Sequence, residues 1–335
     1  MLGVGLHSHP LCSELKGVMQ MSAQKMGRHK SVQELIASSR NKKGKKILEK
    51  IMPILLLMTA LVSILTTFGI VFTLIFETFE FFQRVSITDY LFGTQWLPFS
   101  SKEPLYGILP LIAGTLKVTL MAVLVAVPFG IASAVYLSEY ASDKTRRIVK
   151  PILEVLAGIP TIVYGVFALT FVTPLLQQLI PSLKIFNALS PGLVVGIMIL
   201  PMIASLSEDA MSSVPNSIRD GALALGATKL EVAIQVVLPA ALSGIVASVV
   251  LAISRAIGET MIVSLAGGST PVLDLDVTGS IQTMTAYIVQ VSTGDAGYGT
   301  TIYYSIYAVG FTLFVFTLVM NLFAYFISKH FREEY

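Results

Sequence analysis

Long apolar runs recur along the chain and are separated by short polar segments. An α-helix needs about 20 apolar residues to cross a bilayer core, whereas the strands of a membrane barrel would alternate apolar and polar residues. The runs here are continuous, so they predict an all-α, polytopic membrane protein with six transmembrane helices. The predicted spans are Ile51 to Phe76, Ile108 to Leu137, Ile152 to Leu175, Pro191 to Leu206, Leu242 to Leu265 and Tyr303 to Ile327.

The composition also indicates a membrane protein, and it argues against several kinds of catalytic and metal site. Of the 335 residues, 54% are hydrophobic and 13% are charged, whereas a soluble domain carries roughly 25% charged residues. The single cysteine, Cys12, and the four histidines, His7, His9, His29 and His330, all lie near the two ends. This argues against a disulfide, haem ligation or an intramembrane metalloprotease. No G-x-x-x-x-G-K-[ST] phosphate loop occurs, so we expect no cofactor in this chain and ATP hydrolysis in another.

Lysine and arginine are distributed unequally between the two sides of the predicted spans. Ten precede the first span, and only Arg84, Lys102 and Lys184 fall on the opposite side of the membrane. Because cytoplasmic loops carry an excess of these residues, both termini are expected to be cytoplasmic. We expect a basic cytoplasmic tail without fixed structure in 1–47, the first helix and an outer loop in 48–107, and a helical core in 108–335.

Two outer loops differ from the others. Residues 78–106 form a long segment that holds the only tryptophan, Trp96, a residue type enriched at the membrane–water interface. Residues 267–301 carry aspartates, glycines and small polar residues but no lysine or arginine. This composition predicts irregular, exposed structure.

The cytoplasmic segment 217–239 has an unusual pattern for a connecting loop. Its apolar residues recur at steps of three or four, which predicts two short amphipathic helices. Gly226 lies between them, where a helix can end in a left-handed turn. Thr228 and Glu231 form a candidate capping box, and Pro239 leads into the fifth span. Such a unit either docks into a groove on a partner or lies on the lipid surface, and the pattern alone does not separate the two.

The same segment resembles the EAA loop of ABC importer permeases, in which E-A-A, a glycine, an isoleucine and a closing L-P recur at fixed spacing. The residues at those positions are Asp220, Gly221, Ala222, Gly226, Val236, Leu238 and Pro239. Aspartate for glutamate keeps the carboxylate, while glycine for alanine costs roughly 1 kcal/mol of helix propensity. The resemblance implies that residues 217–239, the coupling loop, contact an ATPase subunit.

Two charged residues, Arg255 and Glu259, lie well inside the predicted fifth span. A charge at the centre of a membrane helix costs about 2.5–3.5 kcal/mol, so such residues face the bundle interior or water. Being four residues apart, they are expected on one helical face. They form either an ion pair or helix clamp, or part of an anion pathway in which the guanidinium forks onto oxyanion oxygens. Ser254 and Thr260 are further candidates for that pathway.

The stretch from Ser254 to Met261 resembles the R-A-x-G-E-T-M run of phosphate ABC permeases, and the Trp-x-Pro segment at 96–98 favours their PstC-type subunit. The resemblance implies a type I importer permease (MetI-like) fold in a bacterial or archaeal cell (inner) membrane, and a transporter subunit that is not an enzyme. The implied partners are a second permease (PstA-type), two ATPase subunits (PstB-type) that bind ATP and Mg, a phosphate-binding protein (PstS-type), phosphate and the lipid bilayer. No nucleic acid is implied.

Rival interpretations remain at this point. A sulfate, molybdate or tungstate permease would also carry an EAA loop. An ion-driven secondary transporter predicts inverted repeats and several intramembrane carboxylates, but only Glu259 lies in mid-span. An intramembrane hydrolase would need a pair such as Ser254 and Lys117, which lie on different predicted helices. Lys117 either contributes to the pathway or snorkels to the outer interface. A G-x-x-x-G at Gly192 and Gly196 predicts close helix packing.

Overall fold

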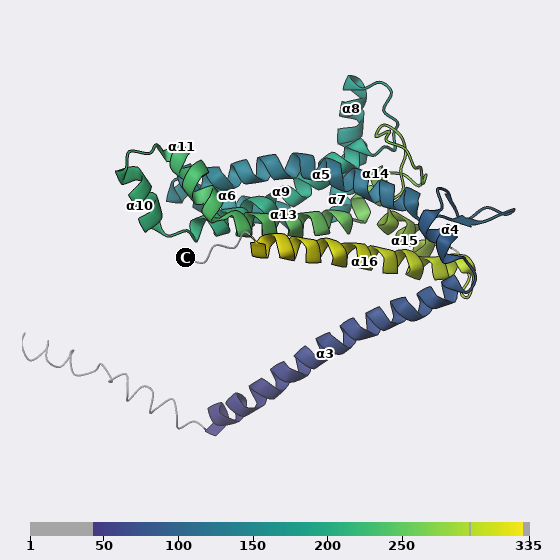
Figure 1. Cartoon of the computed structure of the whole chain (residues 1–335). Coiled ribbons are helices and arrows are strands. Elements are labelled where there is room, and N and C mark those ends of the chain that lie inside the picture. Colours follow the sequence, from purple (N-terminus) through teal and green to yellow (C-terminus); the bar gives the residue numbers. More distant parts are fainter. Residues whose placement is uncertain (1–42, 295, 331–335) are drawn as a thin grey trace, which may run out of the picture. The chain divides into compact units, whose positions relative to one another are not determined.

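Helices make up most of the computed structural model, which describes residues 43–294 and 296–330 (Figure 1). The expected tail, 1–47, lies outside the described residues as far as residue 42. The main helices are α3 (Lys43–Phe82), α4 (Ile87–Phe92), α5 (Leu109–Val135), α6 (Asp143–Ala157), α7 (Thr161–Phe167), α8 (Thr173–Leu179), α9 (Leu189–Ser212), α10 (Asn216–Ala224), α11 (Lys229–Glu231), α12 (Leu238–Ala240), α13 (Leu242–Ile257), α14 (Met261–Ala266), α15 (Met284–Thr293) and α16 (Thr301–His330). Three π-helical turns, η1 (Tyr136–Tyr140), η2 (Ala168–Val172) and η3 (Val232–Val237), and two strands, β1 (Trp96–Leu97) and β2 (Leu105–Tyr106), complete the described chain.

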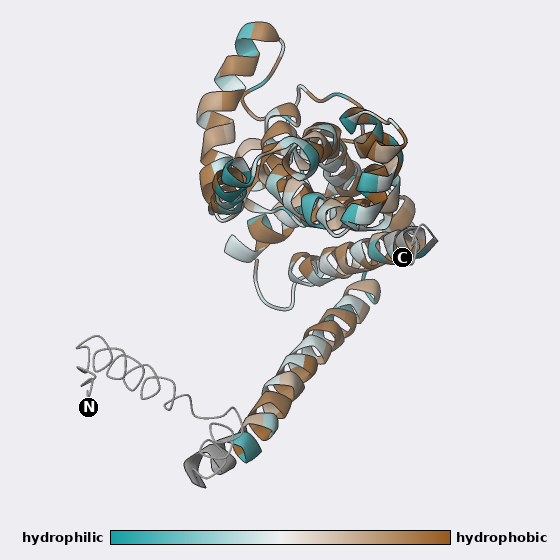
Figure 2. Cartoon of the chain, turned by 90° about the vertical axis from the view of Figure 1, so that its left-hand side faces the viewer, coloured by the Kyte–Doolittle hydropathy of each residue, from teal (hydrophilic) through white to brown (hydrophobic). Residues whose placement is uncertain are grey.

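The chain divides into two units, Met1–Val71 and Phe72–Tyr335. In the first unit, the described residues all belong to α3, and most of its large apolar side chains between Ile51 and Ile70 are exposed. Leu65 and Phe68, for example, are 67% and 71% exposed. A helix that is apolar on every side suits lipid rather than water, and the hydropathy colours of Figure 2 show hydrophobic residues recurring along this ribbon.

The second unit is a bundle in which α5, α9, α13 and α16 run side by side (Figure 1). Helix α9 is the central helix, with α5 and α13 packed against it. A Cβ added at Gly192 would lie 2.8 Å from the Met121 Cβ atom, and one at Gly196 would lie 2.9 Å from the Ala122 carbonyl oxygen. The predicted close packing at this G-x-x-x-G is therefore confirmed, because only glycine lets the α5 backbone approach so closely.

Five helical stretches among the described residues are long and apolar enough to cross a membrane, and a sixth arises if one bent helix pair counts as a span. The five are Glu49–Phe82, Leu109–Tyr140, Thr161–Leu179, Leu189–Ser212 and Thr301–Phe323. The bent pair, Lys229–Ala240 and Leu242–Ile257, turns by 71°. The predicted all-α membrane fold is confirmed.

The third predicted span began too early. Helix α6 ends at Ala157, and the next helical stretch that can cross a membrane starts at Thr161. Between them Gly158, Ile159 and Pro160 interrupt the helix, because proline disfavours helical geometry at the residue before it. The continuous apolar run concealed this break.

The outer loop 78–106 is more ordered than the sequence predicted. Helix α3 continues to Phe82, α4 follows, and β1 and β2 form an antiparallel hairpin that pairs Trp96 with Tyr106. Trp96 is only 1% exposed and packs edge-to-face on Tyr287 with ring centroids 4.8 Å apart. The Trp96 ring is therefore enclosed by the chain itself and is not exposed to lipid or water. Its ring completes a buried aromatic cluster, whose other members are Phe81, Tyr90, Tyr106 and Tyr287.

The second outer loop, 267–301, was expected to be irregular throughout. Its first half is irregular, but α15 occupies Met284–Thr293, with Thr283 accepting a hydrogen bond from the Ala286 amide as the helix cap. The β-branched and apolar residues of this stretch are buried against the bundle. The loop composition therefore predicted only half of the segment.

Candidate functional site

The fifth predicted span is broken at the position of its charged residues. Helix α13 ends at Ile257 and α14 begins at Met261. Glu259 lies between them, is 7% exposed, and its carboxylate accepts hydrogen bonds from the Met261 and Ile262 amides at 3.1 and 3.2 Å. Glu259 thus satisfies amides that a helix start leaves without partners.

Arg255 and Glu259 do not form the expected arrangement. Arg255 belongs to the last turn of α13 and Glu259 lies beyond the helix end, so the expectation of one shared helical face is wrong. No ion pair joins these two described residues. Arg255 is half-buried and close enough to Tyr164 of α7 for an electrostatic interaction between the two side chains. The guanidinium charge is therefore not neutralised by Glu259.

The break is held closely by neighbouring elements. A Cβ at Gly165 of α7 would lie 3.1 Å from the Met261 carbonyl oxygen, so α7 and α14 touch through their backbones. Thr285 of α15 donates a hydrogen bond to the Glu259 carbonyl at 2.7 Å. These contacts fix the position of the break between α7 and α15.

The other two pathway candidates have partners within the chain. The Ser254 hydroxyl donates to the Asn321 side-chain oxygen at 2.5 Å, which joins α13 to α16. The Thr260 hydroxyl donates to the Gly258 carbonyl at 3.1 Å. Among the four candidates, Arg255 is therefore the one whose charge is suited to an anion.

The coupling loop folds largely as predicted. Helices α10 and α11 flank a turn in which Gly226 has φ +90°, in the left-handed region that favours glycine. Thr228 and Glu231 form the predicted capping box. Hydrogen bonds from the Thr228 amide and hydroxyl lower the pKa of the exposed Glu231 carboxyl. The turn is therefore fixed by short-range interactions that the sequence specifies.

The apolar face of the loop divides between two environments. One set packs against a buried cluster of this chain that includes Val214 and Ile245; the set is Ile218, Ala222, Val236 and Leu238. Another set is exposed, and Leu225 is the extreme case at 92%; the set is Leu223, Leu225, Leu230 and Ile234. The remaining positions of the motif, Asp220, Gly221 and Pro239, are also exposed. The loop therefore presents an uncovered apolar surface beside a carboxylate.

Sequence reasoning missed a charged network at this end of the bundle. Glu208 of α9 has a fully buried side chain and pairs with Arg146 and with Lys150, whose Nζ lies 2.8 Å from its Oε2 atom. Lys150 also contacts Asp209 at 2.5 Å, and Ser212 donates to Glu208 at 2.9 Å. A signal was present, since Arg146 and Lys150, like Glu208 and Ser212, are four residues apart and share one helical face.

Lys117 also has a partner that the sequence did not indicate. Its Nζ atom lies 2.5 Å from the Asp274 carboxylate and 3.2 Å from the Asp276 carbonyl, and its side chain is 10% exposed. Hydrogen bonds from the Thr278 amide and hydroxyl lower the pKa of Asp276. Lys117 therefore anchors the loop after α14 instead of snorkelling as an isolated charge.

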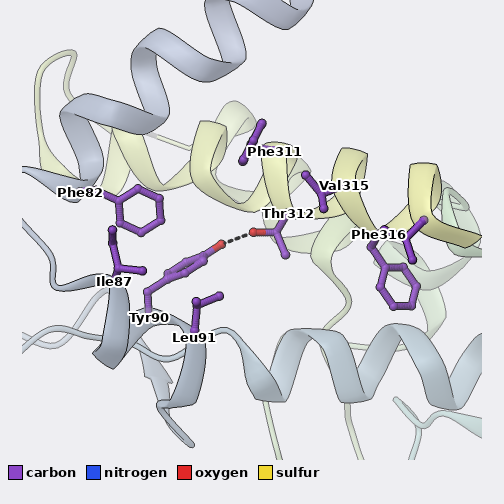
Figure 3. A pocket seen from close by; sticks show the side chains of 9 residues that line it. Phe82, Ile87, Tyr90, Leu91, Phe311, Thr312, Val315 and Phe316 are labelled. Carbon is purple, nitrogen blue, oxygen red and sulfur yellow. Dashed lines mark hydrogen bonds between the residues drawn. The ribbon is translucent and has the colours of Figure 1, made fainter.

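A groove between two helices of the bundle has no lining suited to an anion. This groove, of about 400 Å³ between α4 and α16, is lined by Phe82, Ile87, Tyr90, Leu91, Phe311, Thr312, Val315, Phe316 and Val319 (Figure 3). Its two hydroxyls bind each other at 2.8 Å, so its lining offers no free polar group and no cation. Arg255 lies outside this groove.

Five to six candidate membrane spans, a helix broken beside Arg255 and a capped two-helix loop mark the chain as a polytopic membrane protein with a structured loop between two of its helices. Residues 126–333 match the family described as the binding-protein-dependent transport system inner membrane component. The chain belongs to this family. It is therefore an inner-membrane transporter subunit and not an enzyme, and it works with an ATPase and a substrate-binding protein.

Curated relatives extend this match. The probable ABC transporter permease protein YqgH of Bacillus subtilis (strain 168) is 36% identical over 248 residues, covering 73% of this chain and 79% of the relative. The phosphate transport system permease protein PstC of Xylella fastidiosa (strain 9a5c) is 33% identical over 252 residues, covering 69% and 76%.

Solved structures agree on the fold. A chain of a bacterial ABC transporter involved in the import of the acidic polysaccharide alginate superposes with a TM-score of 0.60 at 17% identity, covering 87% of this chain and all of that chain. A chain of the MetNI methionine ABC transporter gives a TM-score of 0.51 at 18% identity, covering 67% and 96%. The predicted MetI-like permease fold is confirmed.

Proposed function

We propose that this chain is the PstC-type permease subunit of an ATP-driven phosphate importer and forms half of the translocation pathway. The cargo is supported by the relatives named as phosphate permeases. The main structural support for a phosphate site is Arg255, a cation in the proposed fifth span. Glu259, four residues later, does not pair with it and instead caps α14. A guanidinium presents a planar fork of donors that matches phosphate oxygens.

The coupling loop supplies the connection to ATP hydrolysis. Its exposed apolar side chains and Asp220 form a surface suited to a groove on an ATPase subunit. In the proposed complex, two PstB-type subunits bind ATP and Mg, and their closure moves the loop and opens the pathway outward. A PstS-type protein then delivers phosphate, and a PstA-type permease completes the pathway. Both termini lie in the cytoplasm, as the distribution of lysine and arginine requires.

Arg255 gives phosphate a transient contact along this path. A carboxylate paired with Arg255 would compete with an anionic cargo for the guanidinium. The Glu259 carboxylate instead accepts hydrogen bonds from two backbone amides. Ser254 directly precedes Arg255 in the sequence, and Thr260 directly follows Glu259. Their hydroxyls can rotate to donate to a passing oxyanion. No covalent step takes place in this chain.

The second candidate cargo is another oxyanion: sulfate, molybdate or tungstate. The specific reason to keep it is that an arginine fork binds the oxygens of any tetrahedral oxyanion, so Arg255 alone does not select among them. Selectivity would then lie largely in the binding protein.

Labelled uptake at limiting supply tests this proposal, in cells that lack the gene and carry either the wild-type chain, Arg255→Gln or Arg255→Lys. Phosphate, sulfate and molybdate are assayed in parallel, and Arg147→Gln is the matched control because Arg147 is an exposed arginine. We expect the wild type and the control to restore phosphate uptake only, Arg255→Gln to abolish it in an assembled complex, and Arg255→Lys to retain part of it. Rescue of a different oxyanion would overturn the cargo, and normal transport by Arg255→Gln would overturn the site.

A further inference from the structure

Arg219 lies in α10, directly before the Asp220 position of the EAA-type motif, and its side chain points back toward the bundle. The guanidinium donates to the Met211 carbonyl at 2.7 Å and to the Val214 carbonyl at 2.5 Å. These carbonyls belong to the last turn of α9 and the residues just after it. Helix C-termini leave such carbonyls without partners and favour a nearby cation. Arg219 therefore attaches the coupling loop to the end of the central helix.

The same guanidinium reaches a third element. The Nε and Nη2 atoms of Arg219 both lie 3.3 Å from the Glu139 Oε1 atom. Glu139 belongs to η1, the π-helical turn that ends α5, and it also accepts a hydrogen bond from Ser138 at 2.8 Å. The side chains of Arg219 and Glu139 are only 15% and 10% exposed. A charge pair so far removed from solvent is costly to leave half-complete.

The apolar contacts of the loop do not fix its direction in the same way. Ile218 and Ala222 pack against the cluster around Val214 and Ile245, and such contacts are non-directional. Arg219, in contrast, donates to two backbone carbonyls at the end of α9 and, through two nitrogens, to one oxygen of Glu139 in η1. This set of hydrogen bonds, the Arg219 fork, orients α10 relative to both α9 and η1, because hydrogen bonds depend on direction as well as distance. π-Helical turns are also frequent at functional positions within helices.

We infer that Arg219 and Glu139 are positioning residues that transmit movement of the coupling loop to α5 and α9. This inference rests on the proposed function, because it requires an ATPase that moves the loop. When the ATPases displace α10, the Arg219 fork carries the ends of the two helices with it. Without the fork, ATP hydrolysis continues but moves less cargo.

The test uses the complete transporter, reconstituted in liposomes with its ATPase subunits and loaded binding protein. The measured quantity is the amount of phosphate imported per ATP hydrolysed by assembled complex. The variants are Glu139→Ala, Glu139→Gln and Arg219→Lys, since lysine cannot reproduce the fork. Arg147→Lys is the matched control, because Arg147 is an exposed arginine on the neighbouring α6. If Glu139→Ala fails to assemble, the milder Glu139→Gln and Arg219→Lys decide the result.

We expect each variant of Arg219 or Glu139 to hydrolyse ATP at close to the wild-type rate. The amount of phosphate imported per ATP hydrolysed should fall about five- to tenfold, which is at the lower end of measured couplings between sites. The control keeps the wild-type ratio. A merely structural role would lower the yield of complex and leave the ratio unchanged, and that result would overturn the inference. If the wild-type complex imports sulfate or molybdate instead, the proposed cargo is wrong and the ratio is judged on that oxyanion. If the wild-type complex hydrolyses ATP but imports no oxyanion, the proposed function and the inference both fall.

Discussion

At the coupling end of the bundle, which carries residues 216–240, buried charges supplement an apolar cluster, whereas at the hairpin end, which carries β1 and β2, aromatic rings make up much of the buried cluster. At the coupling end, Glu208 and Arg219 each bind several partners on neighbouring helices. At the opposite end, the Trp96 ring contacts the rings of Tyr90, Tyr106 and Tyr287, which belong to three different segments. Helix α5 contributes residues to both ends, while the other segments and the kind of contact differ between them.

The two kinds of contact suit different tasks. Aromatic packing buries a large area without exchangeable partners and resists displacement. A charged network costs desolvation and is a weaker source of net stability, but its members can exchange one partner for another. The coupling end, which we propose is moved by the ATPases, therefore contains directional contacts, whereas the hairpin end, which carries the outer loops, relies on aromatic packing.

The largest expected effect is at the hairpin end. Trp96→Ala removes a ring that is 1% exposed, and large-to-small changes of buried aromatic residues cost about 3–5 kcal/mol. Thermal unfolding of purified chain in detergent measures the loss. Trp96→Phe should be much milder, because the indole nitrogen has no hydrogen-bond partner to lose.

Ser100→Ala is the matched control for that end, since Ser100 is an exposed hairpin residue. Its effect should stay within about 0.5 kcal/mol. A Trp96→Ala protein as stable as this control would contradict the claim that the hairpin end is held by aromatic packing.

The next effect is at the coupling end. Glu208→Gln removes the buried carboxylate from Arg146 and Lys150, and breaking a buried charge network by removing one partner costs about 3 kcal/mol. Because Arg146 and Lys150 are partly exposed, this figure is the lower end of the roughly 3–5 kcal/mol lost when a buried charge pair is broken. The same unfolding assay measures it, with Glu154→Gln on the exposed side of α6 as control. Equal stability of the two variants would show that the network holds nothing together.

Two glycines of the coupling loop give opposite predictions. Gly226→Ala places a Cβ at φ +90° in open space, so the only penalty is the left-handed backbone, about 1–2 kcal/mol. Gly221→Ala lies within α10, also in open space, and should stabilise the helix by up to about 1 kcal/mol. Hydrogen exchange of the α10 amides measures both. Effects of the same sign would show that backbone conformation does not govern this loop.

The smallest expected effect is a titration. Hydrogen bonds from Thr228 lower the pKa of Glu231, so the capping box stabilises the loop above the ordinary glutamate pKa of about 4.3. This contribution is lost as the pH falls through the lowered pKa of the folded loop. Carbon NMR of the Glu231 carboxyl should give a midpoint below the ordinary value in the wild type, and Thr228→Val should raise it. A midpoint unchanged by Thr228→Val would show that the Thr228 side chain does not lower the pKa of Glu231.

The coupling loop could be predicted from the sequence because its determinants are local. The left-handed turn needs Gly226, and the capping box needs two residues three positions apart, so spacing alone defined both. Hydropathy likewise predicted the membrane spans, since burial in lipid requires only a continuous apolar run.

The features that the sequence did not reveal depend on distant contacts or on breaks that leave the hydropathy unchanged. Glu208 meets Arg146 from a different helix, and Trp96 is buried by rings such as Tyr287 that lie far along the chain. The break at Glu259 was hidden because capping replaces a helical hydrogen bond without changing the composition. The expectation that Arg255 and Glu259 share one helical face was wrong for that reason, although both residues do lie at the break.

Transport by a purified complex tests the central claim most directly. This chain is reconstituted in liposomes with a PstA-type permease and PstB-type ATPases, with ATP inside and phosphate-loaded binding protein outside. The account predicts ATP-dependent accumulation of labelled phosphate that requires this chain and is lost with Arg255→Gln. Assembled liposomes that hydrolyse ATP but accumulate no phosphate would contradict it.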